Sequence, residues 1–134
     1  MLEWRGNEVT ARLQRASRLG IDQTTAACVR LAKEDAPRRT GAYHGSIQMR
    51  PAAPRGRAVV GIWGSFSILY AIFIELGTKA HIIRPRNKRA LYWPGASHPV
   101  PRVHHPGTEA NPVLQNAAEK EYPKLASRIR SNLT

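Results

Sequence analysis

The distribution of proline is the feature that most constrains how this chain can fold. All ten prolines lie after residue 36, and six of them fall between residues 85 and 112. Proline lacks a backbone N–H and clashes with the preceding helical turn, so it ends or kinks helices and is confined to the edges of sheets. Long helices are therefore expected only in residues 1–36 and near the C-terminus. The middle of the chain must consist of short strands, turns and loops.

The first 36 residues have the pattern of helices. One helix is expected over residues 7–19, with Asn7 as its N-cap and Gly20 just after its end. Asp22 can cap a second helix that ends before Pro37. A single helix bent at Gly20 is the alternative. The apolar faces are thin and rich in alanine, and they comprise Val9, Leu13 and Ala16, then Ala27, Cys28 and Leu31.

The segment after Pro37 predicts a β-hairpin. Residues 46–50 alternate between polar and apolar side chains, and residues 58–63 are rich in β-branched residues, so both segments are predicted to be strands. Residues 51–56 contain two prolines and a glycine, which indicates a turn or short loop. Residues 70–75 are apolar on nearly every side, and their periodicity fits either a buried strand or a short helix.

Residues 79–107 are expected to form an extended arm rich in proline and basic residues. A second hairpin is predicted within residues 82–93, with residues 86–89 at its tip. A last helix is predicted from Asn111 as N-cap and Pro112 as first helical residue. Pro123 should kink or split this helix. Its apolar seam comprises Leu114, Ala118, Tyr122, Leu125, Ile129 and Leu133.

These elements predict a single α+β domain over residues 1–134. It would have N-terminal helices, a small antiparallel β-sheet with an extended basic arm or hairpin, and a C-terminal helix. A helical segment would occupy residues 1–36. The hairpin and the apolar segment that follows it would occupy residues 37–78, the arm residues 79–107, and the last helix residues 108–134.

The net charge of +12 is concentrated in the middle of the chain. Residues 37–107 hold eleven basic residues against Glu75 alone, whereas the two ends are nearly neutral. Such a field attracts nucleic acid or acidic protein surfaces. The basic and aromatic side chains of the arm suit a protein interface or single-strand stacking, and because the aromatic residues adjoin Leu91 and Pro94 in a predicted strand, an interface or core role is favoured. These candidate contact residues are Arg84, Arg86, Lys88, Arg89, Tyr92, Trp93 and Arg102.

No set of residues predicts catalysis or a metal site. Four of the five histidines lie in the arm, but their spacing matches no closed zinc site and no cysteine accompanies them. The serines lack the context of an activated nucleophile. The lone Cys28 lies among small apolar residues and is expected to be a buried thiol. Glu75 is expected either to pair with an arginine of the arm or to end its element in solvent.

Three short motifs follow one another along the chain. Residues 36–47 contain Pro-Arg-Arg-Thr-Gly, residues 70–78 read Tyr-Ala-Ile-Phe-Ile-Glu-Leu-Gly-Thr, and His-Pro-Gly-Thr at residues 105–108 precedes Asn-Pro-Val-Leu-Gln-Asn-Ala at residues 111–117. This ordered series resembles the small head–tail joining and tail-completion proteins of long-tailed bacteriophages. The chain departs from that pattern at Val113, where an aromatic residue is common, and in its long arm. The positions that carry the resemblance are Pro37, Thr40, Gly41, Tyr70, Glu75, Gly77, Thr78 and Pro112.

The resemblance implies a structural protein of the phage neck or tail, with no enzymatic activity and no cofactor. It implies a homo-oligomeric ring, six-fold or alternatively twelve-fold, that joins the portal-side connector to tail-tube or tail-terminator proteins. DNA would pass through the ring without being read, and no membrane would be involved. The protein would be made in the bacterial host cytoplasm and located in the virion. The resemblance also favours a short helix at residues 70–75. A non-specific, basic nucleic-acid-binding protein is the alternative.

Overall fold

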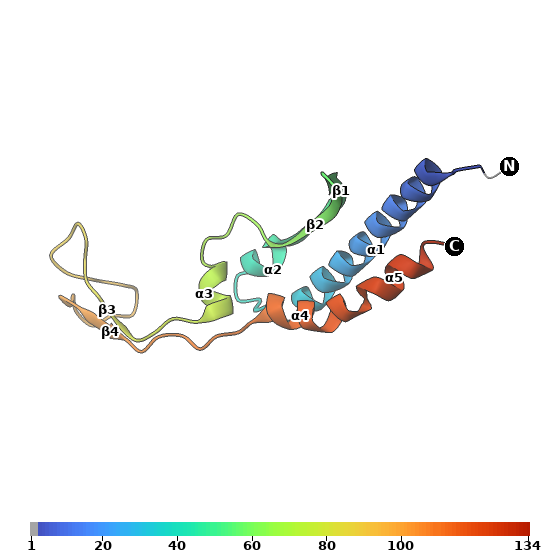
Figure 1. Cartoon of the computed structure of the whole chain (residues 1–134). Helices are drawn as coiled ribbons and strands as arrows, with labels where there is room; N and C mark the ends of the chain where they lie inside the picture. The colour runs from blue at the N-terminus through green and yellow to red at the C-terminus, as the bar shows by residue number, and fades with distance from the viewer. Residues whose placement is uncertain (1–2) are drawn as a thin grey trace. The chain divides into compact units, whose positions relative to one another are not determined.

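A computed structural model describes residues 3–134 and shows an α+β chain, as predicted. It is 45% helical and 20% strand, with two small antiparallel sheets. Two units can be distinguished: the first comprises residues up to 71 and from 112 onward, and the second comprises residues 72–111. The elements are drawn in Figure 1: α1 (Gly6–Asp35), α2 (Ala42–Ser46), β1 (Ile47–Arg55), β2 (Ala58–Ser65), α3 (Ala71–Leu76), β3 (His81–Ile83), β4 (Val103–His105), α4 (Val113–Glu121), the 3₁₀ helix η1 (Tyr122–Lys124) and α5 (Leu125–Ser131).

A single helix, α1, replaces the two helices that were predicted around Gly20. Gly20 is buried in its interior, where an added Cβ would lie 2.9 Å from the backbone nitrogen of Ile129. The glycine therefore permits close approach of α5 and does not end the helix. Asp22 does not cap a second helix, because its Oδ1 instead accepts a hydrogen bond from the N–H of Ala52 on β1, at 2.7 Å.

The ends of α1 also differ partly from the prediction. The helix begins at Gly6 with Arg5 as N-cap, so Asn7 lies inside it and is not its cap. Val9 and Leu13 are exposed, and packing begins only at Ala16. At the other end the helix stops at Asp35 and Ala36 is extended, as the following proline requires.

The predicted β-hairpin is present, but its first strand is longer than expected. β1 and β2 pair antiparallel in a two-stranded sheet, with an irregularity in register between Arg50 and Ala53. The interpretation of residues 51–56 as a loop was wrong, because β1 continues to Arg55 and only Gly56 and Arg57 form the turn. In a two-stranded sheet β1 is an edge strand, and an edge strand tolerates the two prolines.

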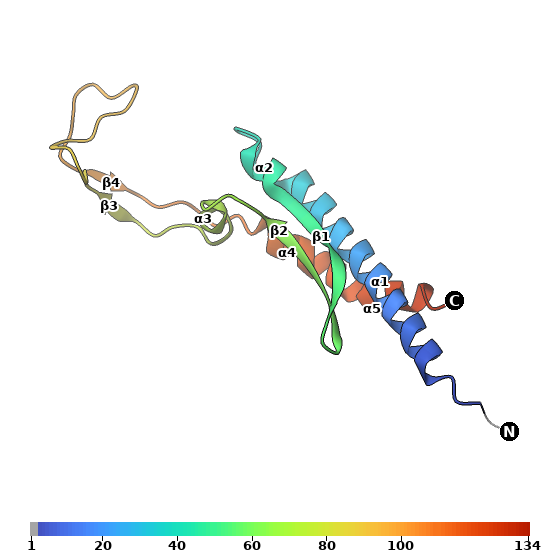
Figure 2. The same ribbon diagram turned by 90° about the horizontal axis from the view of Figure 1, so that it is seen from above.

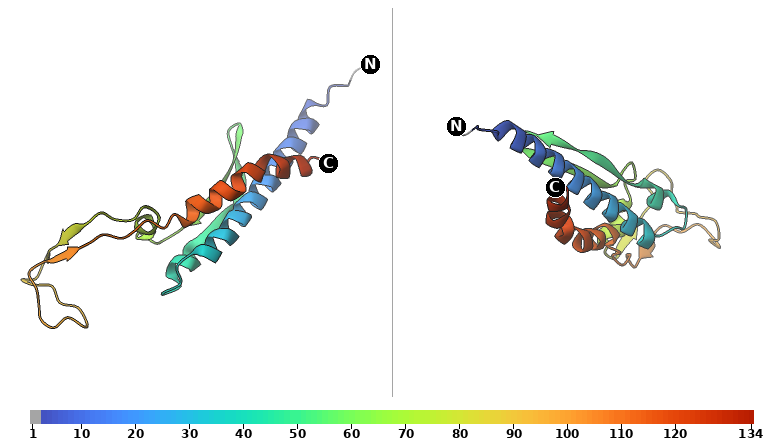
Figure 3. Two further views of the ribbon diagram at one scale, coloured as in Figure 1. Left: turned by 90° about the horizontal axis from the view of Figure 1, so that it is seen from below. Right: turned by 90° about the vertical axis from the view of Figure 1, so that its right-hand side faces the viewer.

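The core of the first unit lies around α1, which packs against the hairpin and against α4 and α5. Figure 3 shows α1 running beside these helices, and Figure 2 shows the hairpin beside α1. Cys28 is buried as predicted, together with Ile47 and Val113. Most other buried positions are small, which allows close backbone approach in a thin core: Ala16, Ala32, Ala36, Ala52, Ala71 and Ala117.

Pro123 splits the C-terminal helix into α4 and α5, with η1 between them, as predicted. Pro112 is the N-cap of α4 and Val113 its first residue, so the predicted start at Asn111 was early by one position. The buried face of α4 consists of Val113, Ala117 and Glu121, one position before the predicted seam. The predicted seam residue Tyr122 is exposed and accepts a hydrogen bond from Trp63 Nε1 at 3.0 Å.

The second unit contains α3 except for its first residue, and the sheet of β3 and β4. A short helix at α3 agrees with the favoured interpretation of residues 70–75. The predicted hairpin within residues 82–93 was wrong, because β3 pairs with β4 and Leu91 bridges to Val100. Residues 86–90 form a bend instead. No helix within residues 3–134 is long and apolar enough to cross a membrane.

Candidate functional site

The second unit is held together by a clasp, which we define as the paired segments Gly77-Thr78 and Gly107-Thr108. The N–H of each threonine donates to the carbonyl oxygen of the other, at 2.9 and 3.1 Å, and their hydroxyl oxygens lie 2.7 Å apart. Two of the motifs that carry the family resemblance therefore meet in space. A third backbone bond, from Asn111 N–H to Ile74 oxygen at 2.8 Å, ties the returning chain to α3.

Both glycines of the clasp are required by its geometry. Gly77 and Gly107 have φ values of 70° and 88°, a region that disfavours side chains. A Cβ on Gly77 would lie 2.6 Å from the carbonyl oxygen of Thr108, and one on Gly107 would collide with the carbonyl oxygen of Thr78. The Gly-Thr signature thus has a structural explanation: it lets two backbones cross closely.

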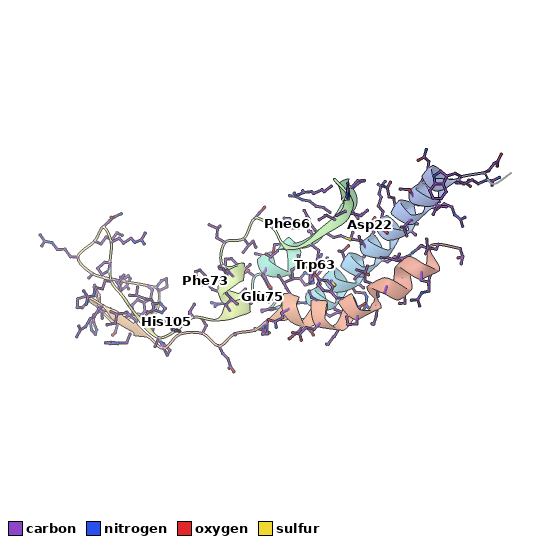
Figure 4. The ribbon with its side chains drawn as sticks, in the orientation of Figure 1. Asp22, Trp63, Phe66, Phe73, Glu75 and His105 are labelled. Atoms are coloured by element: carbon purple, nitrogen blue, oxygen red, sulfur yellow. The ribbon has the colours of Figure 1, made fainter. Side chains whose placement is uncertain are left out.

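Beyond the clasp, a short ribbon carries stacked imidazole rings. His81 and His105 face each other across β3 and β4, with ring centroids 4.9 Å apart and an angle of 26° between the rings. His81 Nδ1 lies 2.8 Å from the carbonyl oxygen of Lys79, and His105 Nδ1 accepts a hydrogen bond from the N–H of Gly107. Figure 4 labels His105 on the ribbon. The rings therefore stack as a structural pair that continues the clasp.

The second unit has no buried side chain. Every residue from 72 to 111 is exposed or half-buried, although the segment contains many large apolar residues. Leu76 is 71% exposed and Tyr92 is 67% exposed. The other exposed large apolar side chains are Ile72, Phe73, Ile82, Ile83 and Trp93. The unit is therefore held by backbone hydrogen bonds, and its apolar side chains are available to a partner.

The second unit is also strongly basic. Its six cations are all exposed, and none of them forms an ion pair in the part of the chain that the structure describes. Glu75 and Glu109 are its two carboxylates, and Glu75 is half-buried. Cations without internal partners suit contact with a polyanion or an acidic protein surface. They are Lys79, Arg84, Arg86, Lys88, Arg89 and Arg102.

The fold brings only some of the predicted contact residues together in one place. Arg86, Lys88 and Tyr92 line one hollow together with Pro85 and Leu91. The other predicted residues, Arg84, Arg89, Trp93 and Arg102, are exposed and do not line it. A second hollow is lined by Phe73, Lys79, Ile83, the stacked His81 and His105, and three residues of the clasp, Gly77, Thr78 and Thr108. Sequence reasoning did not identify that hollow, because its lining comes from segments about thirty residues apart in the chain.

The remaining signature residues have structural positions. Pro37 follows the end of α1, and Pro112 caps α4. Gly41 has a φ of 75° and is the N-cap of α2, while Thr40 Oγ1 accepts a weak hydrogen bond from the N–H of Ala42 at 3.4 Å. Tyr70 is half exposed ahead of α3. These residues form turns and caps.

A buried ion pair in the first unit was not identified from the sequence. The Glu121 side chain is 4% exposed, and its carboxylate accepts hydrogen bonds from Arg128 at 2.5 Å and Lys124 at 2.9 Å. Arg128 also donates to Thr24 Oγ1 on α1. The hydrogen bond from Arg128, followed by that from Lys124, lowers the pKa of Glu121 below its ordinary value of 4.5. This network fixes α4, α5 and α1 to one another.

Cys28 is a free cysteine in the core of the first unit. Burial raises the pKa of the Cys28 thiol to about 11, so at neutral pH the thiol is protonated and unreactive. Within residues 3–134 no group of three or more histidine, cysteine, aspartate or glutamate side chains is placed to hold a metal ion. What the described residues do present is the exposed, basic and apolar surface of the second unit. Comparison of the chain with protein-family models, curated proteins and solved structures gives no match.

Proposed function

We propose that this protein is a structural subunit of the neck or tail of a long-tailed phage or prophage-like particle. In this role copies form a ring, of six or alternatively twelve, that joins the portal-side connector to tail-tube or tail-terminator proteins. The proposal is supported by the ordered motifs at residues 36–47, 70–78 and 105–117. The protein then acts by association, without a catalytic step and without a cofactor.

The observation that carries this proposal is the second unit's lack of a buried side chain. A segment of its size has too little interior to be stable on its own core, and usually needs metal, disulfides or association. Large apolar patches that remain exposed typically mark interaction sites. Residues 72–111 supply such side chains on a backbone that the clasp holds in a defined path. Burial against neighbouring subunits would supply the missing core.

The charge of the second unit indicates what kind of neighbour it meets. Six exposed cations without ion pairs would be repelled by another basic surface, so an acidic surface is the complementary partner. In the proposed particle, the acidic partner is a neighbouring protein of the connector or the tail. DNA in the channel would meet the same cations without base-specific contacts.

Deletion of the arm tests the proposal. Residues 80–104 are replaced by a short Gly/Ser linker, which the structure allows because Thr78 and Thr108, just outside the deleted segment, pair with each other. The helices of the first unit should remain, as measured by circular dichroism, while heads and tails should accumulate unjoined in a complementation assay. The control inserts the same linker after Gly95, in an exposed turn, and retains every arm residue. Infectious particles made with the deleted protein would overturn the proposal.

The alternative function, non-specific binding of nucleic acid, is favoured by the same unpaired cations. Changing Arg84, Arg86, Lys88 and Arg89 to Ala removes four charges. If these residues bind phosphates, the slope of log affinity against log salt should shrink by up to about four units, equally for all sequences. The matched control removes four exposed arginines of the first unit: Arg38, Arg39, Arg55 and Arg57. Unchanged DNA binding together with failed assembly favours the structural role.

A further inference from the structure

The two edges of the β1–β2 hairpin are chemically different. Along the second half of β1, Pro51 and Pro54 have no N–H group to donate, and the N–H of Ala52 is already bonded to Asp22 of α1. Proteins protect edge strands from unwanted pairing with such features. The outer edge of β1 is therefore closed to another strand over that half.

The outer edge of β2 is open. The N–H of Phe66 donates to the oxygen of Ser46, which fixes the alternation of bonded and non-bonded pairs along the hairpin. By that alternation, Trp63 and Ser65 direct their N–H and C=O groups away from β1, and so do Val59 and Gly61. No backbone hydrogen bond joins this edge to any other segment of residues 3–134.

The composition of β2 does nothing to protect this edge. Its eight residues, Ala-Val-Val-Gly-Ile-Trp-Gly-Ser, include no charge and no proline. An uncharged, apolar strand with an unpaired edge is a ready template for β-strand addition. The two faces of β2 also differ. One face lies on α1, where an added Cβ at Gly61 would meet the side chain of Ile21. The other face points away from α1, and Ile62 on it is 37% exposed.

We propose that two copies of the protein pair along β2, antiparallel, to form a four-stranded sheet in the order β1-β2-β2-β1. The occupant of the edge is a second copy because β2 is the open edge of each hairpin and is self-complementary. When Val59 faces Ser65 and Gly61 faces Trp63 of the other copy, every outward N–H and C=O of these four residues finds a partner. A two-fold axis, the commonest symmetry of homo-oligomers, relates the copies.

This register places Ile62 of one copy opposite Ile62 of the other copy, at the two-fold axis. The pair is of the non-hydrogen-bonded type, in which facing Cα atoms lie about 4.5 Å apart. It lies on the face of the sheet away from α1, so the helices of both copies cover the other face. The dimer goes beyond the proposed function, since it concerns the free protein and the first unit, whereas joining is assigned to the second unit.

Cross-linking tests the register. Ile62→Cys should give a disulfide-linked dimer under mild oxidation, because facing residues of this type meet the distance that a disulfide requires. Val60→Cys is the matched control, since it lies on the same face of the same strand but would face Gly64 of the other copy. The native Cys28 is buried and should not cross-link. Equal cross-linking of the two variants, or none with Ile62→Cys, contradicts this register.

The mass of the free protein tests the dimer itself. Native mass spectrometry and light scattering at tens of micromolar should give twice the chain mass of 14.9 kDa. Ile62→Lys should yield folded monomers, because two ammonium groups would face each other at the axis, and Val60→Lys should remain dimeric. Circular dichroism confirms folding of each variant. A monomeric wild-type protein, or a dimer that survives Ile62→Lys, would refute the pairing, and the arm-deleted protein should still dimerise.

Discussion

Removing the buried carboxylate of Glu121 should be the most destabilising charge change in the first unit. Glu121→Gln keeps the size of the side chain but leaves Arg128, whose side chain is 23% exposed, without its anion. A hydrogen bond to a charged group contributes about 1.5–3 kcal/mol. The bond from Lys124 adds little, because that side chain is 57% exposed. We therefore expect Glu121→Gln to lower the free energy of unfolding by about 2 kcal/mol.

The chain offers a matched control in the exposed pair of Arg30 and Glu34 on α1. These side chains are 62% and 57% exposed, and their charged atoms lie 3.0 Å apart. Exposed helical pairs of this spacing contribute about 0.3–0.5 kcal/mol, so Glu34→Gln should be nearly neutral. Urea unfolding followed by circular dichroism, which reports mainly on the helices of the first unit, separates these two values readily.

The pH dependence of the free energy of unfolding tests whether the Glu121 network stabilises the fold. Because folding lowers the pKa of Glu121, its stabilisation is present above the ordinary value of 4.5 and is lost as pH falls through the lower folded-state value. The gap in stability between wild type and Glu121→Gln should thus close in acid. If Glu121→Gln costs no more than Glu34→Gln at pH 7, or if the gap is the same at every pH, the network does not stabilise the fold as described.

Three further predictions concern close contacts and the thiol. Gly20→Ala should destabilise the protein by about 1–3 kcal/mol in thermal or urea unfolding, although alanine favours helices, because its Cβ meets the backbone of Ile129; a stabilised variant would contradict the close packing. Gly77→Ala should speed amide exchange at Thr78 and Thr108, since its Cβ would meet the carbonyl oxygen of Thr108, whereas Gly95→Ala, with a φ of 95° and open space around it, should leave the clasp intact. Cys28 should react with a thiol reagent only after unfolding, because it is buried and its pKa is raised to about 11; rapid reaction of the folded protein would refute its burial.

The local features of the fold could be predicted from the sequence, because they depend on neighbours in the chain. The hairpin strands, the end of α1 before Pro37 and the split at Pro123 all follow from turn chemistry and backbone restrictions. Residues 70–75 are apolar on nearly every side, so their periodicity could not distinguish a strand from a helix. The helix was favoured only by the family resemblance.

Features that depend on distant contacts could not be predicted in this way. Gly20 indicated a helix end because nothing local shows that Ile129 packs on it. Asp22 has the pattern of a cap, yet it binds a strand thirty residues later. In the arm, a local hairpin was predicted because β4 lies too far along the chain for local signals to indicate its pairing with β3.

In the candidate site, too, some features could be predicted from the sequence and others depended on distant contacts. The basic and aromatic residues of the arm were identified from composition, and their exposure follows from the structure. The clasp could not be predicted from the sequence, because Gly77-Thr78 and Gly107-Thr108 are thirty residues apart and come together only in the folded chain. The open edge of β2 likewise depends on which N–H groups point outward.

A reconstruction of the assembled particle tests the central claim most directly. The account predicts six or twelve copies in a ring around the particle axis, between head connector and tail tube, with residues 72–111 buried against neighbouring subunits. The apolar side chains that are exposed in the free chain, such as Leu76 and Tyr92, should be covered there. A position away from the axis, only one or two copies, or an arm that remains exposed to solvent in the particle would contradict it.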